Sequence, residues 1–231
     1  MKIQGLQKLT LLDYPGKVGC TIFTAGCNFR CPFCHNAALV TKIEDENDIP
    51  VEEVLSFLQK RKGMLEGVCI SGGEPLLQGD IVEFIQQVKE LGYLVKLDTN
   101  GSDVSRLKTL IEDKWIDYVA MDIKNTPEKY GETIGVQNIS VEQVLQSVDF
   151  LLTDKIDYEF RTTVVREFHK REDMTLIGQW LKGAKRYFLQ KFEDSGDLID
   201  TGCRAYTTEI MLQALAIVQE YVPNAQLRGV E

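Results

Sequence analysis

The chain has 231 residues, of which 44% are apolar and 26% charged, and its formal net charge is −9. These proportions are those of an ordinary water-soluble globular protein. The longest basic cluster is Lys60-Arg61-Lys62, so we expect no nucleic-acid partner, because nucleic-acid-binding proteins usually present an extended basic face. No apolar stretch approaches the roughly 18 residues of a membrane-spanning helix, and residues 1–17 lack a signal-peptide pattern. We therefore expect a cytoplasmic protein without membrane contact.

Six strand-like segments, rich in Val, Ile, Tyr, Phe and Thr, alternate with amphipathic helical patterns. The predicted strands are residues 18–23, 67–71, 94–98, 118–122, 158–164 and 187–190. Helices are predicted to begin at Pro50, after a cap at Asp80 and after a capping box of Ser140 and Gln143, and the last covers about 206–221. Strands that alternate with helices pair in parallel. Six units without a repeat or linker predict one α/β domain, either a partial barrel or a doubly wound sheet.

Three of the six cysteines lie in one short segment, GCNFRCPFCH at residues 26–35, directly after the first predicted strand. A structural zinc site needs four protein ligands, and neither His35, adjacent to Cys34, nor the distant His169 suits the fourth position. A four-iron–four-sulfur (4Fe–4S) cluster with three cysteine ligands instead leaves one iron free to bind a substrate. We therefore expect an iron–sulfur cluster on Cys27, Cys31 and Cys34. Two other cysteines, at positions 20 and 69, lie in apolar runs and are expected in the core.

Polar residues follow the predicted strands at their carboxyl ends, where α/β folds collect their active sites. The second strand leads into SGGEP at 71–75, whose glycines let a ligand approach the backbone closely, and the third ends in DTNG at 98–101. Lys124 and Arg161 can offer charge to a carboxylate or ribose, and Asp98 and Asp122 can balance them or coordinate a cation. A mutually satisfied buried ion pair is the alternative for each. Gln190 ends the sixth strand and could line the same pocket.

These motifs together resemble the radical S-adenosylmethionine (radical SAM) enzymes, which use the CxxxCxxC spacing with an aromatic residue before the last cysteine. The segments LLDYPGK at 11–17, FTAGCNFRCPFCHN at 23–36, GGEP, DTNG and DIK at 122–124 further resemble glycyl-radical-enzyme activases. The likeness is greatest to activating proteins of anaerobic ribonucleoside-triphosphate reductase. It covers the first half of the chain well and is mainly architectural after Arg161.

The resemblance implies a partial (β/α)6 TIM-type barrel, with residues 1–231 as one radical SAM core domain. It also implies a 4Fe–4S cluster and SAM at the barrel mouth, with the GGE segment near the amino group of SAM and Phe33 against the adenine. By similarity to pyruvate formate-lyase activases, Asp98, Thr99 and Asp122 would hold a monovalent cation, and Lys124 would contact the carboxylate. The expected cofactor-binding residues are Phe33, His35, Gly72, Gly73, Glu74, Asp98, Thr99, Asp122, Lys124, Arg161 and Gln190.

The implied reaction is reductive cleavage of SAM to a 5′-deoxyadenosyl radical, which removes hydrogen from a glycine of a partner glycyl radical enzyme. A flavodoxin- or ferredoxin-type protein would donate the electron, and no catalytic side chain beyond the cluster is expected. The alternatives are a pyruvate formate-lyase-type activase, a radical SAM enzyme acting on a small molecule, and a non-catalytic iron–sulfur or zinc module. After Asn36 the chain has none of the extra cysteine motifs of a ferredoxin-like insert.

Overall fold

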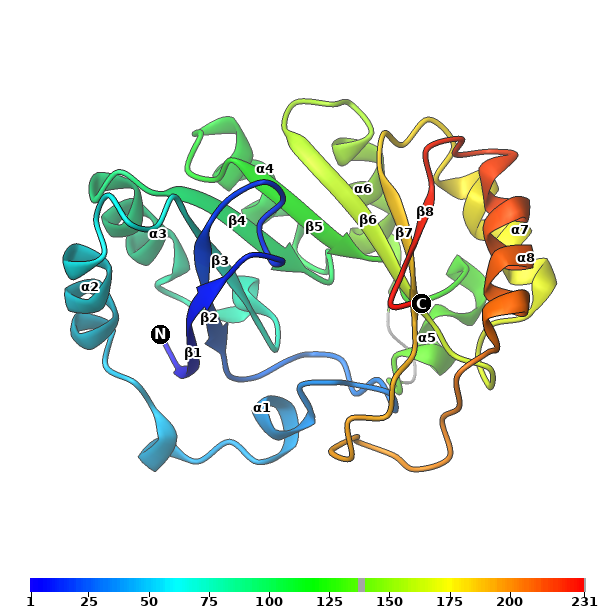
Figure 1. Cartoon of the computed structure of the whole chain (residues 1–231), viewed down its shortest axis with the longest axis horizontal. Coiled ribbons are helices and arrows are strands. Elements are labelled where there is room, and N and C mark those ends of the chain that lie inside the picture. The colour runs from blue at the N-terminus through cyan, green and yellow to red at the C-terminus, as the bar shows by residue number, and fades with distance from the viewer. Residues whose placement is uncertain (137–139, 231) are drawn as a thin grey trace.

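The computed structural model describes residues 1–136 and 140–230, and its centre is one eight-stranded sheet whose strands follow chain order. The six predicted strands are confirmed, and they pair in parallel with one another in chain order. They are β2 (Gly19–Thr24), β3 (Gly67–Gly72), β4 (Leu94–Thr99), β5 (Tyr118–Asp122), β6 (Asp157–Val164) and β7 (Tyr187–Lys191). Since the strand order never reverses, the sheet is a partial TIM-type barrel and not a doubly wound sheet, in which the order changes direction (Figure 1).

Two edge strands were not predicted. β1 (Ile3–Thr10) pairs antiparallel with β2, and β8 (Gln226–Arg228) pairs in parallel with β7. Both lie at an edge of the sheet, where a strand is partly solvated and its sequence lacks the continuous apolar run of a central parallel strand. The sheet therefore has eight strands, where the sequence predicted six.

The helices cover the outer face of the curved sheet, and the apolar core lies between the two layers (Figure 1). In α3, for example, the four apolar residues of one face are at most 2% exposed, and burial of each such side chain contributes roughly 1.5–3 kcal/mol. The helices are α1 (Ala37–Thr41), α2 (Val51–Lys60), α3 (Ile81–Glu90), α4 (Val104–Glu112), α5 (Tyr130–Thr133), α6 (Glu142–Leu151), α7 (Arg171–Trp180) and α8 (Thr208–Gln219). Short 3-10 turns are η1 (Asp45–Asn47), η2 (Pro75–Leu77) and η3 (Pro127–Lys129).

Two predicted helix caps are wrong in detail. Asp80 occupies the cap position of α3, but its side chain makes no capping hydrogen bond and pairs with the N-terminal amine instead. The Ser140–Gln143 capping box does not form, because α6 begins one residue later than predicted and Gln143 accepts the N–H of Val104 at 3.4 Å. In both cases a tertiary partner takes the side chain away from the local helix end. None of the described helices is long and apolar enough to cross a bilayer.

Candidate active site

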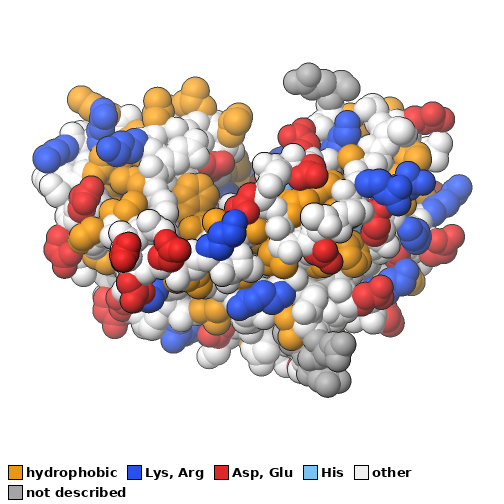
Figure 2. Space-filling view, turned by 90° about the horizontal axis from the view of Figure 1, so that it is seen from below, with side chains coloured by type: hydrophobic (Ala, Val, Ile, Leu, Met, Phe, Trp, Pro, Cys, Tyr) orange, Lys and Arg blue, Asp and Glu red, His pale blue; other side chains and the backbone are white. Residues whose placement is uncertain are grey.

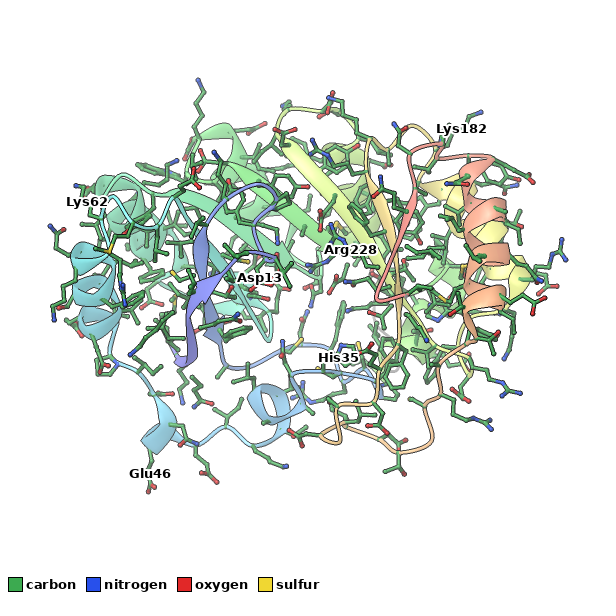
Figure 3. The ribbon with its side chains drawn as sticks, viewed as in Figure 1. Asp13, His35, Glu46, Lys62, Lys182 and Arg228 are labelled. Carbon is green, nitrogen blue, oxygen red and sulfur yellow. The ribbon has the colours of Figure 1, made fainter. Side chains whose placement is uncertain are left out.

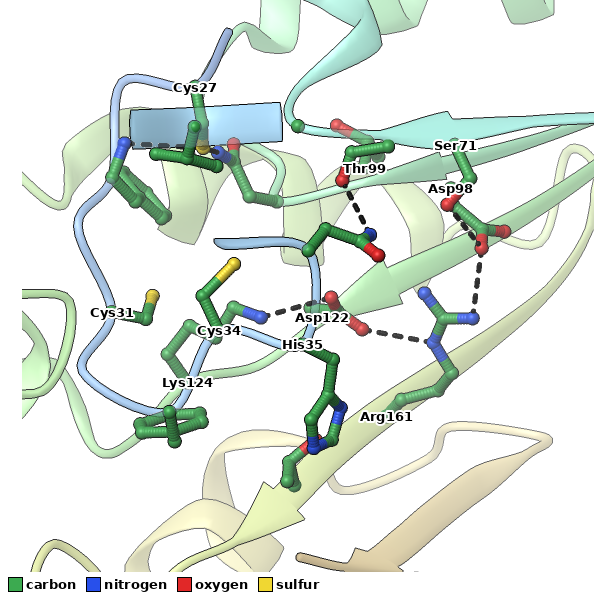
Figure 4. A pocket seen from close by; sticks show the side chains of 18 of the residues that line it. Cys27, Cys31, Cys34, His35, Ser71, Asp98, Thr99, Asp122, Lys124 and Arg161 are labelled. Carbon is green, nitrogen blue, oxygen red and sulfur yellow. Dashed lines mark hydrogen bonds and ion pairs between the residues drawn. The ribbon is translucent and has the colours of Figure 1, made fainter. Parts of the chain in front are cut away.

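A pocket of about 370 Å³ lies at the carboxyl ends of the parallel strands, between the cysteine loop and the inner face of the sheet (Figure 4). The structure brings 13 of the 14 predicted site residues to its wall, and only Glu74 is absent from the lining. In chain order, those 13 are Cys27, Cys31, Phe33, Cys34, His35, Gly72, Gly73, Asp98, Thr99, Asp122, Lys124, Arg161 and Gln190. Residues from six segments of the chain therefore meet in one cavity.

The three cysteines of the loop after β2 turn their side chains toward this pocket. Cys27 Sγ accepts the backbone N–H of Phe29 at 3.3 Å and lies 3.8 Å from Asn100 Nδ2. Burial raises the pKa of Cys27 to about 11 and that of Cys31 to about 12, so metal binding must displace protons from both. Among the described residues, no three His, Cys, Asp or Glu side chains are placed to hold a single metal ion.

Two glycines, the last residue of β3 (Gly72) and the residue that follows it (Gly73), allow the cysteine loop to lie directly on the strand end. Gly73 donates its N–H to Thr24 O, and Glu74 donates its N–H to Gly26 O, both at 2.8 Å. A Cβ atom on Gly73 would lie 2.0 Å from Gly26 O, and one on Gly72, whose φ is +114°, would lie 2.3 Å from Thr24 O. Neither position can take a side chain without moving the backbone. The glycine pair thus sets the height of the cysteine loop above the sheet.

The Glu74 carboxylate points into the protein, where its exposed fraction is 0%. It accepts the N–H of Leu76 at 3.0 Å, the hydroxyl of Thr99 at 2.8 Å and the N–H of Asn100 at 2.7 Å. Burial raises its pKa to about 7, although the three donors pull it down. In this position Glu74 joins the turn after β3 to the turn after β4.

Four charged side chains form a line of ion pairs along one wall of the pocket (Figure 4). Arg161 Nη1 lies 3.1 Å from Asp98 Oδ2, and Arg161 Nε donates to Asp122 Oδ1 at 2.9 Å. Lys124 Nζ lies 3.0 Å from Asp122 Oδ2. Burial would raise the pKa of Asp122, but Arg161 and Lys124 outweigh it and hold that pKa well below its ordinary value. The carboxylates are therefore ionised, and the buried ion pairs that the sequence left as an alternative do form.

The predicted monovalent-cation site does not fit these contacts. Each oxygen of Asp98 and of Asp122 already faces a cationic side chain. The Thr99 hydroxyl is turned away from the two carboxylates, since it donates to Glu74 and accepts the N–H of Gly101 at 3.1 Å. A metal cation needs several free oxygen ligands that converge on one point. These three side chains offer no such point.

Two further predicted residues of the pocket lining, Phe33 and His35, are each held by a neighbouring aromatic ring. Phe33 packs against Phe168 with ring centroids 5.6 Å apart. His35 stacks on Phe192, and its Nε2 lies 3.0 Å from the carbonyl oxygen of Glu193. These contacts fix both rings at the cavity surface, and His35 is bonded away from the cysteine thiols.

His169 does not line this pocket but contacts the backbone of Lys124, which does. It is 1% exposed, its Nδ1 accepts the N–H of Val165 at 3.1 Å, and its Nε2 lies 2.8 Å from the carbonyl oxygen of Lys124. Among the other cysteines, Cys20 and Cys69 are buried as predicted, at 0% and 1% exposed.

Residues 21–176 match the family model of the Radical SAM superfamily. The chain belongs to this superfamily. Radical SAM enzymes bind a 4Fe–4S cluster and SAM, so these are the cofactors of this enzyme. Cys27, Cys31 and Cys34 fit the cluster, because their thiols share one loop and one pocket. The backbone N–H of Phe29, which donates to Cys27 Sγ, is the kind of hydrogen bond that tunes the reduction potential of such clusters.

The chain is similar over most of its length to two curated proteins. It is 35% identical to a protein of Methanocaldococcus jannaschii provisionally named a glycyl-radical enzyme activating enzyme, over 99% of this chain and 96% of the relative. It is 24% identical to the 7-carboxy-7-deazaguanine synthase of Thermoplasma acidophilum, over 91% and 92% of the two chains. Among solved structures, Streptococcus suis SuiB bound to its precursor peptide SuiA superposes with a TM-score of 0.71, over 90% of this chain and 48% of SuiB. At 17% identity, that likeness concerns the fold.

Sequence reasoning missed seven residues that line the pocket of this radical SAM enzyme. Several adjoin a residue that it had singled out, and one, Asn36, donates from its side chain to Gly72 O at 2.9 Å. Asp13 comes from the β1–β2 connection and is labelled in Figure 3; its carboxylate accepts the hydroxyl of Thr21 in β2. The seven are Asp13, Phe29, Asn36, Val40, Ser71, Asn100 and Thr163.

Proposed function

We propose that this radical SAM enzyme is a glycyl-radical-enzyme activase whose substrate is a glycine in a partner protein. The observation that carries the proposal is the 35% identity over 99% of the chain to an archaeal protein provisionally named as such an activating enzyme. The segments at 11–17 and 23–36 support anaerobic ribonucleoside-triphosphate reductase as the partner, with a pyruvate formate-lyase-type enzyme as the alternative. We further propose that residues 1–231 form one core domain and that a flavodoxin or ferredoxin donates the electron.

When bound, the cluster and SAM would supply the radical chemistry, and the protein's own residues would hold and orient them. Cys27, Cys31 and Cys34 would ligate three irons. Lys124, charged at neutral pH, is placed to attract the carboxylate of SAM. The backbone at Gly72 and Gly73 is open to close approach on the pocket side.

Phe33 offers an apolar ring face for the adenine and occupies space that water would otherwise fill.

On the face seen in Figure 2, acidic and basic side chains are interspersed around apolar ones. A protein partner that binds this face would therefore meet charges of both signs.

The test uses protein reconstituted anaerobically with iron and sulfide, with dithionite as the reductant and SAM as the substrate. We expect 5′-deoxyadenosine from the wild type and none from Cys31→Ala. The matched control is Cys20→Ala, which removes a buried cysteine outside the pocket and should keep both iron and product. Product from Cys31→Ala at the wild-type level would refute the assigned ligand set.

The partner is then tested by electron paramagnetic resonance. We expect a glycyl radical signal when the holoenzyme is mixed with anaerobic ribonucleoside-triphosphate reductase, and a signal with pyruvate formate-lyase alone would change the partner. A second candidate function, chemistry on a small molecule, is favoured by the likeness to the Thermoplasma synthase. SAM cleavage that yields no glycyl radical on either protein, but gives 7-carboxy-7-deazaguanine in cells expressing the chain, would support that candidate.

A further inference from the structure

Lys96 is a buried lysine that belongs to none of the recognised motifs. It lies in β4, two residues before Asp98, and residues two apart in a strand point to the same face of a sheet. The exposed fraction of its side chain is 2%. A buried ammonium group is costly unless it is paired, so its partners indicate why it is there.

The Lys96 ammonium group makes an ion pair with Asp98 Oδ1 and lies 3.7 Å from Cys69 Sγ. The other oxygen of Asp98 accepts the Ser71 hydroxyl at 3.2 Å and faces Arg161. Asp98 is thus held from both sides, and Lys96 occupies the side that Arg161 does not reach. Burial alone would lower the pKa of Lys96, but the Asp98 carboxylate outweighs it and raises that pKa, so the group carries its charge.

With Lys96 included, the ion pairs run Lys96–Asp98–Arg161–Asp122–Lys124, and charges of opposite sign alternate along the line. It contains three cations and two anions. An additional metal cation would have to enter beside three like charges in a medium of low dielectric constant, where repulsion is stronger than in water. It would also have to displace one of the existing partners of a carboxylate.

We propose that Lys96 is a built-in cation: it fixes Asp98, and through Asp98 it fixes Arg161, so that this radical SAM enzyme binds SAM without a monovalent metal ion. Lys96 is a positioning residue, because it acts on the cofactor pocket through Asp98 and does not line the pocket itself. The ammonium group is covalently attached to the chain and cannot leave the site as a bound metal ion can. The ion pairs along the pocket wall therefore stay formed whatever salt is present.

The first test measures SAM binding to the anaerobically reconstituted wild-type holoenzyme by equilibrium dialysis. Sodium, potassium and choline chlorides are compared at equal ionic strength, because choline is too large to enter a buried cation site. We expect dissociation constants that agree within about twofold in the three salts. Loss of SAM binding in choline chloride, with recovery in potassium or sodium chloride, would overturn the proposal.

The second test removes the built-in charge with Lys96→Met, which keeps most of the side-chain length. In choline chloride we expect SAM affinity to fall at least about tenfold, and potassium or sodium ions should restore part of it by entering next to Asp98. The matched control is Lys89→Met, which breaks the ion pair of Lys89 with Asp117, 2.7 Å long and outside the pocket. The control should bind SAM equally in all three salts.

A purely structural role for Lys96 predicts a different result. Lys96→Met would then bind SAM more weakly by the same factor in every salt, or bind it as the wild type does, and either outcome would refute the proposal. If Lys96→Met does not fold, Lys96→Gln takes its place. The wild-type comparison needs no variant and decides the cation question by itself.

Discussion

The contact between Gly73 and Gly26 makes the substitution Gly73→Ala a sensitive probe of how the cysteine loop is held. A methyl group at position 73 would lie 2.0 Å from Gly26 O and 2.6 Å from Gly26 C. Both are backbone atoms of the residue just before Cys27, so no side-chain rotation relieves the overlap. The loop must move away from β3, and the hydrogen bond from the N–H of Glu74 to Gly26 O must lengthen or break.

The expected cost follows from these two effects. Forcing an extra methyl group into a packed site costs about 1–3 kcal/mol, and loss of one hydrogen bond costs about 1 kcal/mol. We therefore expect Gly73→Ala to lower the free energy of unfolding by about 2–4 kcal/mol. For a chain of this length, a loss of about 3 kcal/mol lowers the melting temperature by roughly 6–12 °C. The displaced loop should also hold iron less well.

Urea unfolding of the metal-free protein gives the stability, and iron content after reconstitution gives the effect on the cysteine loop. The control is Gly79→Ala, because a methyl group at position 79 would meet no atom within 4 Å and the backbone there has an ordinary conformation. We expect that control to change the stability by less than about 1 kcal/mol. Equal stability and iron content in the Gly73 and Gly79 variants would refute the idea that the glycine pair sets the position of the loop.

Two further predictions concern buried groups near the pocket. Thr99→Val removes a hydroxyl that donates to Glu74 and accepts the N–H of Gly101. Urea unfolding should therefore show that the free energy of unfolding falls by about 1–3 kcal/mol. The control Thr109→Val changes an exposed position and should leave the free energy of unfolding almost unchanged. Burial lowers the pKa of His169 below 6.5, so its contribution to stability is complete above about pH 6.5 and is lost as the pH falls through the folded-state pKa. His169→Gln should flatten that acid-side decline in melting temperature; an unchanged pH profile would contradict the assignment.

The parts of the fold that could be predicted are those that depend on local sequence. The central strands are rich in apolar, β-branched and aromatic residues, because central parallel strands are buried on both faces, and this composition predicted the six parallel strands. Polar residues at the carboxyl ends of those strands, together with the cysteine loop, predicted 13 of the 20 residues that line the pocket, because parallel strands bring these ends to one side of the sheet. The cysteine spacing is also local, and it gave the ligand set that we propose.

The predictions that failed concern side chains whose partners lie far away in the sequence. Asp80 and Gln143 have the right chemistry to cap helices, but the N-terminal amine and the N–H of Val104 take their side chains instead. Glu74 was expected to contact the cofactor, yet three donors from neighbouring turns hold it inside the protein. Lys96 carried a usable signal: in a strand, residues 96 and 98 must share a face, so a lysine beside that aspartate predicts an ion pair.

The buried line of charges is better explained by positioning than by stability. A buried ion pair often contributes little net stability, because desolvation of two charges offsets their attraction, whereas removal of one partner costs about 3–5 kcal/mol. Every inner member of this line has a partner on each side, so the loss of one ion pair at an end also alters the position of the next pair. Lys124, at the pocket end, is therefore held by Asp122, which Arg161 holds in turn. A cation fixed in this way can meet the carboxylate of SAM without first being ordered, and that saving in side-chain entropy favours binding.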